Sequence, residues 1–225
     1  MKTIKISREH FSSSQGRNWI KAVNCLSGFK SVNLIGTKRT EGSANLAIIS
    51  SLFHLGANPP LMGFVLRPHS GESPRHTLLN IKERSFFTIN HIHADILKKS
   101  HQTSARYPRD CSEFEACGLS EEYKDNFQAP FVQESRIQLA MELLNIVDVP
   151  ENGTHIVIGQ IKDIYLPEDT LKKDGFIDLQ LAGSLCVSGL DAYYSPTLLE
   201  RLSYAKPDKE VTPLTIDGEP IVTTS

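Results

Sequence analysis

Short apolar runs separated by Gly, Pro and Asn recur along this chain of 225 residues. Ser31–Thr37 alternates between apolar and polar positions, which predicts the first core strand. A longer stretch, Thr40–Arg67, begins with small polar residues and continues through two apolar runs, 46–53 and 61–66. Because Asn58-Pro59-Pro60 interrupts the pattern between them, these runs are predicted to be two strands around a turn.

The pattern then changes to a helical period. Residues 68–74 have the composition of a loop, and His76–Glu83 is typical of a short amphipathic helix. Ser85–Asn90 is dense in aromatic and β-branched residues and is predicted to be a strand. The helix residues expected to face the core are Leu78, Leu79 and Ile81.

A helical insertion is predicted in the middle of the chain. Ala94–Ser104 has an acidic residue in its first turn and two lysines later, as the helix dipole prefers. Tyr107-Pro108 breaks this helix. Ser112 followed three residues later by Glu115 matches a capping box, which predicts a second short helix that Gly118 ends.

Strand patterns return in the second half. Ile137–Leu143 alternates cleanly, and Thr154–Tyr165 is a second long strand, with Glu151–Gly153 as the hairpin turn between them. A short strand is predicted at 175–179, and 190–194 ends the regular part. Strands without regularly alternating helices, and no GxGxxG after a strand, argue against a dinucleotide-binding α/β domain. The pattern predicts one mainly β, antiparallel β-barrel with peripheral helices.

Charge and composition exclude several classes of partner. The formal net charge of −2 leaves no electrostatic footprint for nucleic acid. No apolar run approaches the roughly 20 residues that span a bilayer, and the first residues lack the apolar block of a secretory signal. We therefore expect a cytoplasmic protein without nucleic-acid or membrane partners. Cys25, Cys111, Cys117 and Cys186 form no CxxC pair and are expected to be free thiols.

Candidate binding chemistry lies in the stretch 40–67. Small residues around Asn45 allow a flat ring to approach main-chain groups. The adjacent hydroxyls of Ser50 and Ser51, with the guanidinium of Arg67, are the donors that a phosphate dianion needs. An ordinary buried hairpin with incidental serines is the other interpretation of the same residues.

Other polar residues carry weaker signals. His91 and His93 stand two residues apart, but no Cys or carboxylate follows at a convincing spacing, so we predict no metal site. His101 fits either a role in access to the site or polar packing. Tyr193 and Tyr194 are expected to pack in the barrel or at an interface.

Several blocks, taken in order, resemble the flavin reductase-like, FMN-binding split-barrel family that includes flavoredoxin. The blocks are SVNLIGT at 31–37, GSANLA at 42–47 with Ser50-Ser51 and Asn58-Pro59-Pro60, Arg67-Pro68 with HTLLNI at 76–81, Gln102–Ser104 with SEF at 112–114 and Gly118-Leu119, and GLDAYY at 189–194. The resemblance implies a split antiparallel β-barrel domain over residues 30–195, after an N-terminal segment, 1–29, and before a C-terminal arm, 196–225.

The family resemblance also implies a function. It implies non-covalent FMN, a homodimer with flavin near the interface, and electron transfer from NAD(P)H through FMN to an acceptor. A non-catalytic FMN-binding electron carrier or sensor is the alternative, and a barrel that has lost its cofactor is a third. No side chain need act as nucleophile or obligatory acid, because the cofactor carries the redox chemistry. The expected cofactor-binding residues are Asn45, Leu46 and Ala47 at the ring, Ser50, Ser51, Arg67, Thr77 and Lys82 at the phosphate, Asn80 at the ribityl chain, and Thr103 and Ser104 from the insertion. A helix cap is the other interpretation of both Thr77 and Asn80.

Overall fold

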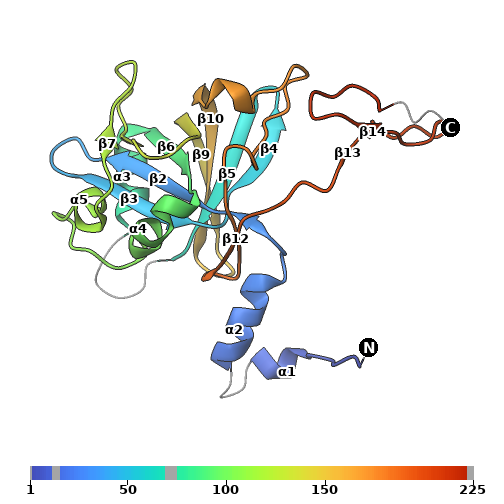
Figure 1. Ribbon diagram of the computed structural model, residues 1–225. Helices are drawn as coiled ribbons and strands as arrows, with labels where there is room; N and C mark the ends of the chain where they lie inside the picture. The colour runs from blue at the N-terminus through green and yellow to red at the C-terminus, as the bar shows by residue number, and fades with distance from the viewer. Residues whose placement is uncertain (1, 12–15, 69–74, 222–225) are drawn as a thin grey trace.

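A seven-stranded antiparallel sheet, in the order β3-β2-β6-β9-β10-β5-β4, is the centre of the protein (Figure 1). The structure is a computed structural model that describes residues 2–11, 16–68 and 75–221. The loop predicted at 68–74 lies, apart from Pro68, outside these described residues. The strands of this sheet are β2 (Asn33–Lys38), β3 (Ala44–Ile49), β4 (Phe53–Ala57), β5 (Pro60–Leu66), β6 (Phe86–His91), β9 (Gln138–Val149) and β10 (Thr154–Tyr165).

The remaining elements are short, and those between β1 and β12 lie around this sheet, so the predicted mainly β fold with peripheral helices is confirmed. The helices are α1 (Arg8–Phe11), α2 (Gly16–Cys25), α3 (His76–Arg84), α4 (Leu97–Gln102) and α5 (Glu113–Cys117), with 3₁₀ turns η1 (Ala94–Ile96) and η2 (Glu168–Thr170). The short strands form a three-stranded sheet of β1 (Lys30–Ser31), β11 (Cys186–Ser188) and β12 (Ala192–Tyr194), and the pairs β7 (Glu121–Glu122) with β8 (Phe131–Val132) and β13 (Arg201–Leu202) with β14 (Pro213–Leu214).

The long hairpin of β9 and β10 joins the two halves of the sheet. β9 pairs with β6 on one side, and β10 pairs with β5 on the other. The register between β9 and β10 shifts twice, after Ile158 and after Ile161, and such bulges bend and twist the strands that carry them. The predicted hairpin turn is confirmed, since Val149 pairs with Thr154 across it.

The chain crosses from one edge of the sheet to the other between β3 and β4. At this corner the Ser51 hydroxyl donates to the Val65 carbonyl oxygen at 2.9 Å and accepts from the Val65 amide at 3.1 Å. The apolar run 46–53 is therefore not one strand. Its first part pairs with β2, and the turn at Asn58-Pro59 joins the separate strand β4 to β5.

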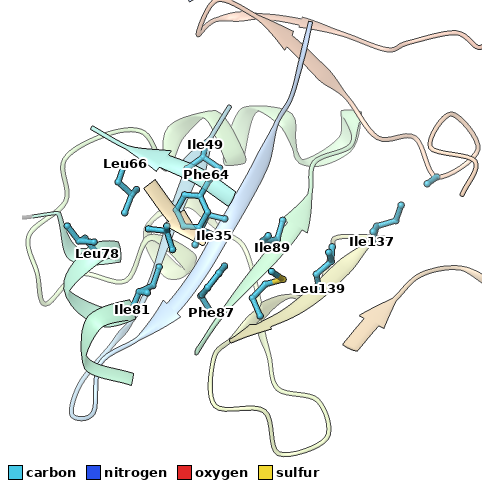
Figure 2. Close-up of a cluster of buried hydrophobic side chains, with 13 residues drawn as sticks. Ile35, Ile49, Phe64, Leu66, Leu78, Ile81, Phe87, Ile89, Ile137 and Leu139 are labelled. Atoms are coloured by element: carbon cyan, nitrogen blue, oxygen red, sulfur yellow. The ribbon is translucent and has the colours of Figure 1, made fainter. Parts of the chain in front are cut away.

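Two buried clusters pack on opposite sides of β2. The first contains Ile35, Phe64 and Phe87, and Figure 2 shows these side chains between the strands and α3. The second contains Leu34 of β2 together with Phe114 of α5. β2 is buried along both faces for this reason, and the helical insertion acts as a second layer over the sheet.

Helix α3 confirms the predicted helix at 76–83 but corrects one of its inward residues. Leu78 and Ile81 lie three positions apart and are buried in the first cluster. Leu79 is 36% exposed, because a neighbouring position on a helix is rotated by about 100° from the buried face. The prediction that Leu79 faces the core is therefore wrong.

The insertion contains the two predicted helical segments, in altered form. Residues 94–102 form η1 and then α4, and α5 ends at Gly118, whose φ of 70° is the left-handed conformation that Gly adopts easily. Ser112 makes no side-chain capping bond, so the capping-box prediction is wrong. Phe114, buried in the second cluster, holds this short helix instead.

The two ends of the chain extend away from the barrel (Figure 1). α2 projects on one side, and the segment after Tyr194 carries β13 and β14 on another, so the predicted extended arm contains two short paired strands. The strand predicted at 175–179 is reduced to a single bridge between Leu171 and Ile177. Among the described residues, no helix has the length and apolar character needed to cross a membrane.

Candidate functional site

A cavity of about 890 Å³ opens beside the edge strand β3. One wall is β3 with the corner that follows it, and another is the end of β5 with the start of α3. Residues 101, 103–107 and 113 of the insertion, the end of the β11–β12 sheet, and residues of α2 and β1 also contribute to the lining. The sequence blocks at 42–51, 67, 76–77 and 102–104, which are far apart along the chain, therefore meet at one site.

Most of the predicted cofactor-binding residues line this cavity. They are Asn45, Ala47, Ser50, Ser51, Arg67, Thr77, Thr103 and Ser104. Three others do not line it. The Leu46 side chain is fully buried in the second cluster, the Asn80 amide points to Thr37, and Lys82 is exposed on α3. The assignment of the eight as flavin ligands remains a prediction.

A buried polar network fixes the floor of the cavity. The Asn45 amide nitrogen donates to Thr77 Oγ1 at 3.1 Å and to Thr37 Oγ1 at 3.3 Å. The Asn80 amide nitrogen donates to the same Thr37 oxygen at 3.1 Å. Buried polar groups require such partners, and here the network ties α3 to β2 and β3. Asn80 therefore acts on the site through Thr37, whereas Thr77, which accepts from Asn45, retains its own proton for a ligand.

The predicted hydroxyls are not equivalent donors. Ser51 donates to Val65, and Thr103 donates to the Ser100 carbonyl oxygen at 2.8 Å while accepting from the Ile48 amide at 3.0 Å. Both hydroxyl protons are therefore used in hydrogen bonds within the protein. Ser50 and Ser104 lie on the lining without such a structural role among the described hydrogen bonds, and they are the better candidates for a ligand contact.

Positive charge is concentrated at one end of the cavity. Lys30, Arg67, Arg75 and Arg106 all line it. The pKa of Arg75 is lowered first by burial and then by the charges of Arg106 and Arg67. The pKa of Lys30 is likewise lowered by burial and by Arg67. Cations that lower one another's pKa create a positive potential, which favours an anionic ligand at this end.

Several contacts hold these cations in place. The Lys30 ammonium donates to the carbonyl oxygens of Asn24 and Gly189 at 3.0 and 2.9 Å, and Arg67 donates to Asn24 Oδ1 at 2.9 Å. His76, the first residue of α3, also lines the cavity, and its pKa is lowered by burial and by nearby arginines. Helix N-termini favour anions, so α3 adds to the same preference.

Sequence reasoning did not assign Lys30, Arg75 or His76 to the site. Lys30 directly precedes the predicted first strand, and Arg75 and His76 directly precede Thr77. A helix start carrying basic residues is a recognisable anion signal, which would have identified two of the three.

The lining of the cavity also includes His101 and Tyr193, which contact each other. His101 Nδ1 lies 2.6 Å from the Tyr193 hydroxyl, and the two rings meet edge to face. Burial raises the pKa of Tyr193. The interpretation of Tyr193 as a packing aromatic missed this contact. The Leu46 amide, expected to face a flavin ring, instead donates to Glu113 Oε2 at 3.0 Å.

The residues outside the cavity have separate partners. His91 Nδ1 lies 2.9 Å from the Ser184 hydroxyl, and His93 Nε2 lies 2.9 Å from the Glu134 carbonyl oxygen. Among the described residues, no three His, Cys, Asp or Glu side chains are arranged to hold a metal ion. All four cysteines are free thiols, and Cys117 Sγ lies 3.7 Å from the Tyr107 hydroxyl.

Comparison with known proteins places this cavity in context. Residues 28–183 match the family described as flavin reductase like domain. A crystal structure from Shewanella frigidimarina NCIMB 400, described as a candidate flavin reductase with split barrel domain, is 48% identical, covers 90% of this chain and 100% of its own, and has a TM-score of 0.86.

Two more distant structures share the fold. Flavoredoxin of Desulfovibrio vulgaris (Miyazaki F) is 20% identical over 80% of this chain and 92% of its own, with a TM-score of 0.65. An FMN-binding protein from Thermus thermophilus is 16% identical over 75% of this chain and 86% of its own, with a TM-score of 0.61. The fold of this chain is therefore that of a split barrel, as predicted.

Proposed function

Since this chain belongs to the flavin reductase-like domain family, we propose that it is an FMN-binding oxidoreductase that moves electrons from a reduced nicotinamide through FMN to an acceptor. The observation that carries the proposal is the cavity beside β3, with apolar side chains on its walls and cations at one end. A volume of about 890 Å³ lies within the usual range for small-molecule sites.

The residues present fit the two chemically different parts of FMN. Ala47, Ile48 and Leu52 provide a small, mostly apolar wall for a flat ring. Arg67 and Arg75, with the start of α3, provide charge and donors for a phosphate dianion. Thr77 accepts from the Asn45 amide, which leaves its hydroxyl proton available to the ligand.

In this proposal the cofactor supplies the redox chemistry, and the chain binds, orients and shields it. The network of Asn45, Thr77 and Thr37 keeps the floor rigid, so the ligand meets preorganised groups. Ser50 and Ser104 supply neutral hydroxyls, and the insertion limits the access of water from one side. No nucleophile is required for this reaction class.

The test begins with the purified protein and its visible spectrum. Titration of apoprotein with FMN is expected to quench flavin fluorescence to a one-to-one end point. Anaerobic stopped-flow mixing of the loaded protein with NADH or NADPH is then expected to bleach the flavin absorbance at a rate compatible with turnover. A protein that binds no FMN in the micromolar range refutes the proposal.

A non-catalytic electron carrier or sensor is the second candidate, because the same cavity would bind FMN without a site for a donor. The stopped-flow experiment separates the two. Bleaching by either nicotinamide much more slowly than reoxidation by added acceptors supports the carrier, whereas fast bleaching with one nicotinamide supports the oxidoreductase.

We further propose a homodimer with the cavity near its interface. Leu26 and Phe29 beside the cavity residues Asn24 and Ser27 are 79% and 67% exposed, and Leu199 of the C-terminal arm is 97% exposed. Contiguous exposed apolar side chains mark interaction surfaces, and Leu26 and Phe29 lie close together along the chain. Light scattering is expected to give the mass of two chains, and Leu26→Asp is expected to shift it toward one. A single-chain mass for the unaltered protein at micromolar concentration contradicts this.

A further inference from the structure

Side chains of the insertion, and not another strand, cover the outer edge of β3. β3 is the last strand on its side of the sheet, so the amides that point away from β2 need other partners. The Leu46 amide donates to Glu113 Oε2, and the Ile48 amide donates to Thr103 Oγ1, both at 3.0 Å. Both contacts satisfy an edge amide of β3, one with a carboxylate oxygen and the other with a hydroxyl oxygen.

Glu113 combines burial with a position on the cavity. The residue is 6% exposed, yet it lines the cavity together with Asn45 and Thr103. Burial raises the pKa of Glu113, while hydrogen bonds from the Leu46 amide and its own amide act in the opposite direction. A buried carboxylate is costly unless it is compensated, and two neutral amides compensate it only in part.

The carboxyl is not needed for covering the edge. Thr103 performs that role for Ile48 with a neutral hydroxyl, and a neutral amide side chain at position 113 would accept from Leu46 equally well. Glu115, two residues further along the same helix, is exposed. An ionisable side chain in this buried position can bind a proton next to the ligand, which a neutral side chain cannot do.

The titratable groups around Glu113 come from α3, α4, α5 and β12 and from the segment before α5. α5 itself contributes Cys117, whose pKa is raised by burial and by the charge of Glu113. His101 of α4 lines the cavity and contacts Tyr193 of β12, and His76 of α3 also lines the cavity. The groups from the segment before α5 that also line the cavity are Arg106 and Tyr107. The residues of β3 that line the cavity carry no titratable side chain.

We propose that Glu113 is the proton-binding residue of this cavity, taking up a proton from solvent when an aromatic ligand fills the space beside β3. The ligand excludes water that solvates the carboxylate in the open cavity, so the neutral acid becomes the favoured form. The proton adds to a carboxylate oxygen, no other bond changes, and the Leu46 contact is kept. The identity of the ligand as a flavin rests on the proposed function.

Linkage fixes the sign of the effect. A carboxyl that binds its proton more tightly in the filled cavity makes the ligand bind more tightly at low pH. The affinity is expected to fall as the pH rises from the value at which the open-cavity carboxyl titrates to the higher value at which the filled one titrates. His76 acts oppositely, since covering an imidazole favours its neutral form and releases a proton.

The test is the pH dependence of riboflavin binding, measured by fluorescence quenching between pH 5 and 8. Riboflavin has no phosphate, so the titration of that group does not contribute. The dissociation constant of the unaltered protein is expected to rise with pH by up to about tenfold per pH unit. Glu113→Gln, which keeps an acceptor for Leu46, is expected to remove this rise, and Glu115→Gln is the matched control that keeps it.

The possible outcomes are distinct. Equal pH profiles for the unaltered protein and Glu113→Gln, with both binding riboflavin, overturn the inference and leave the proposed function standing. A His76→Gln background removes the opposing imidazole, so a profile that stays flat there also counts against Glu113. Failure of the unaltered protein to bind either riboflavin or FMN overturns the proposed function and this inference together.

Discussion

Replacing Arg67 with Ala is predicted to weaken the binding of FMN and to leave the binding of riboflavin unchanged. Arg67 follows β5, its guanidinium lies on the cavity lining, and Asn24 Oδ1 holds it at 2.9 Å. FMN and riboflavin differ only in the phosphate. An arginine that contacts the phosphate therefore affects one ligand, whereas an arginine that shapes the cavity affects both.

The expected size follows from the exposure of the guanidinium. Hydrogen bonds between charged partners contribute about 1.5–3 kcal/mol when they are shielded from water. Arg67 is exposed, so screening by solvent and salt reduces its contribution to about 1.5 kcal/mol, which corresponds to roughly a tenfold change in affinity. The neighbouring Lys30 and Arg75 maintain positive potential, which also limits the loss.

Fluorescence titrations of two ligands against two proteins give four dissociation constants and one coupling free energy. Arg67→Lys keeps the charge but loses the planar donor pair. Its affinity for FMN is therefore expected to lie between that of Arg67→Ala and that of the unaltered protein. Lys98→Ala removes an exposed cation of α4 that does not line the cavity and is the matched control. Higher salt is expected to reduce the difference in FMN affinity between the unaltered protein and Arg67→Ala, and to leave their riboflavin affinities unchanged.

Equal weakening of FMN and riboflavin by Arg67→Ala refutes the phosphate assignment. An FMN affinity that stays within twofold refutes it as well, because the protein then holds the dianion without this guanidinium. A loss in Lys98→Ala as large as that in Arg67→Ala shows that only net charge matters and refutes a specific contact.

Three further predictions concern the scaffold and are checked by urea unfolding of the ligand-free protein. Ser51→Ala removes both hydrogen bonds to Val65 and is expected to lower the free energy of unfolding by about 1–3 kcal/mol, whereas Ser50→Ala has little effect; equal losses contradict the role of the corner. Gly36→Ala places a Cβ against the Pro130 carbonyl oxygen and is expected to cost about 1–3 kcal/mol or more, while Gly56→Ala, with 3.5 Å to its nearest neighbour, changes the free energy by less than about 0.5 kcal/mol. Desolvation lowers the pKa of His91 from 6.5 to about 4, so the unfolded chain binds a proton that the folded one refuses, and about 3 kcal/mol of stability is lost as the pH falls from 6.5 to 4. His91→Gln is expected to flatten that part of the pH profile, and an unchanged profile contradicts it.

Local signals explain which parts of the fold were predictable. β9 and β10 were found because alternation repeats within each strand and because a short turn joins them. α3 was found from its apolar spacing, and the misplaced Leu79 shows the limit of that signal, since adjacent leucines do not reveal which one faces the core. The corner at Ser51 was missed because nothing in the run 46–53 marks where pairing with β2 stops.

The contacts that complete the site are invisible to local patterns. Glu113 meets Leu46 across 67 positions, and His101 meets Tyr193 across 92. Lys30 meets Gly189 across 159 positions. Periodicity reports on neighbours within a turn or a strand, so it identifies residues at the site only where their own segment is distinctive, as at Ser50-Ser51. Glu113 looks like any acidic residue at the start of a helix.

The same two residues of the insertion cover the edge of the sheet and line the cavity. The edge of β3 would otherwise offer unpaired amides to another strand, which is a hazard for a sheet protein. Thr103 and Glu113 cover those amides and at the same time form one wall of the cavity. The groups that cover the sheet edge therefore also line the cavity, and in our proposal Glu113 takes up its proton next to the contact with Leu46 without breaking that contact.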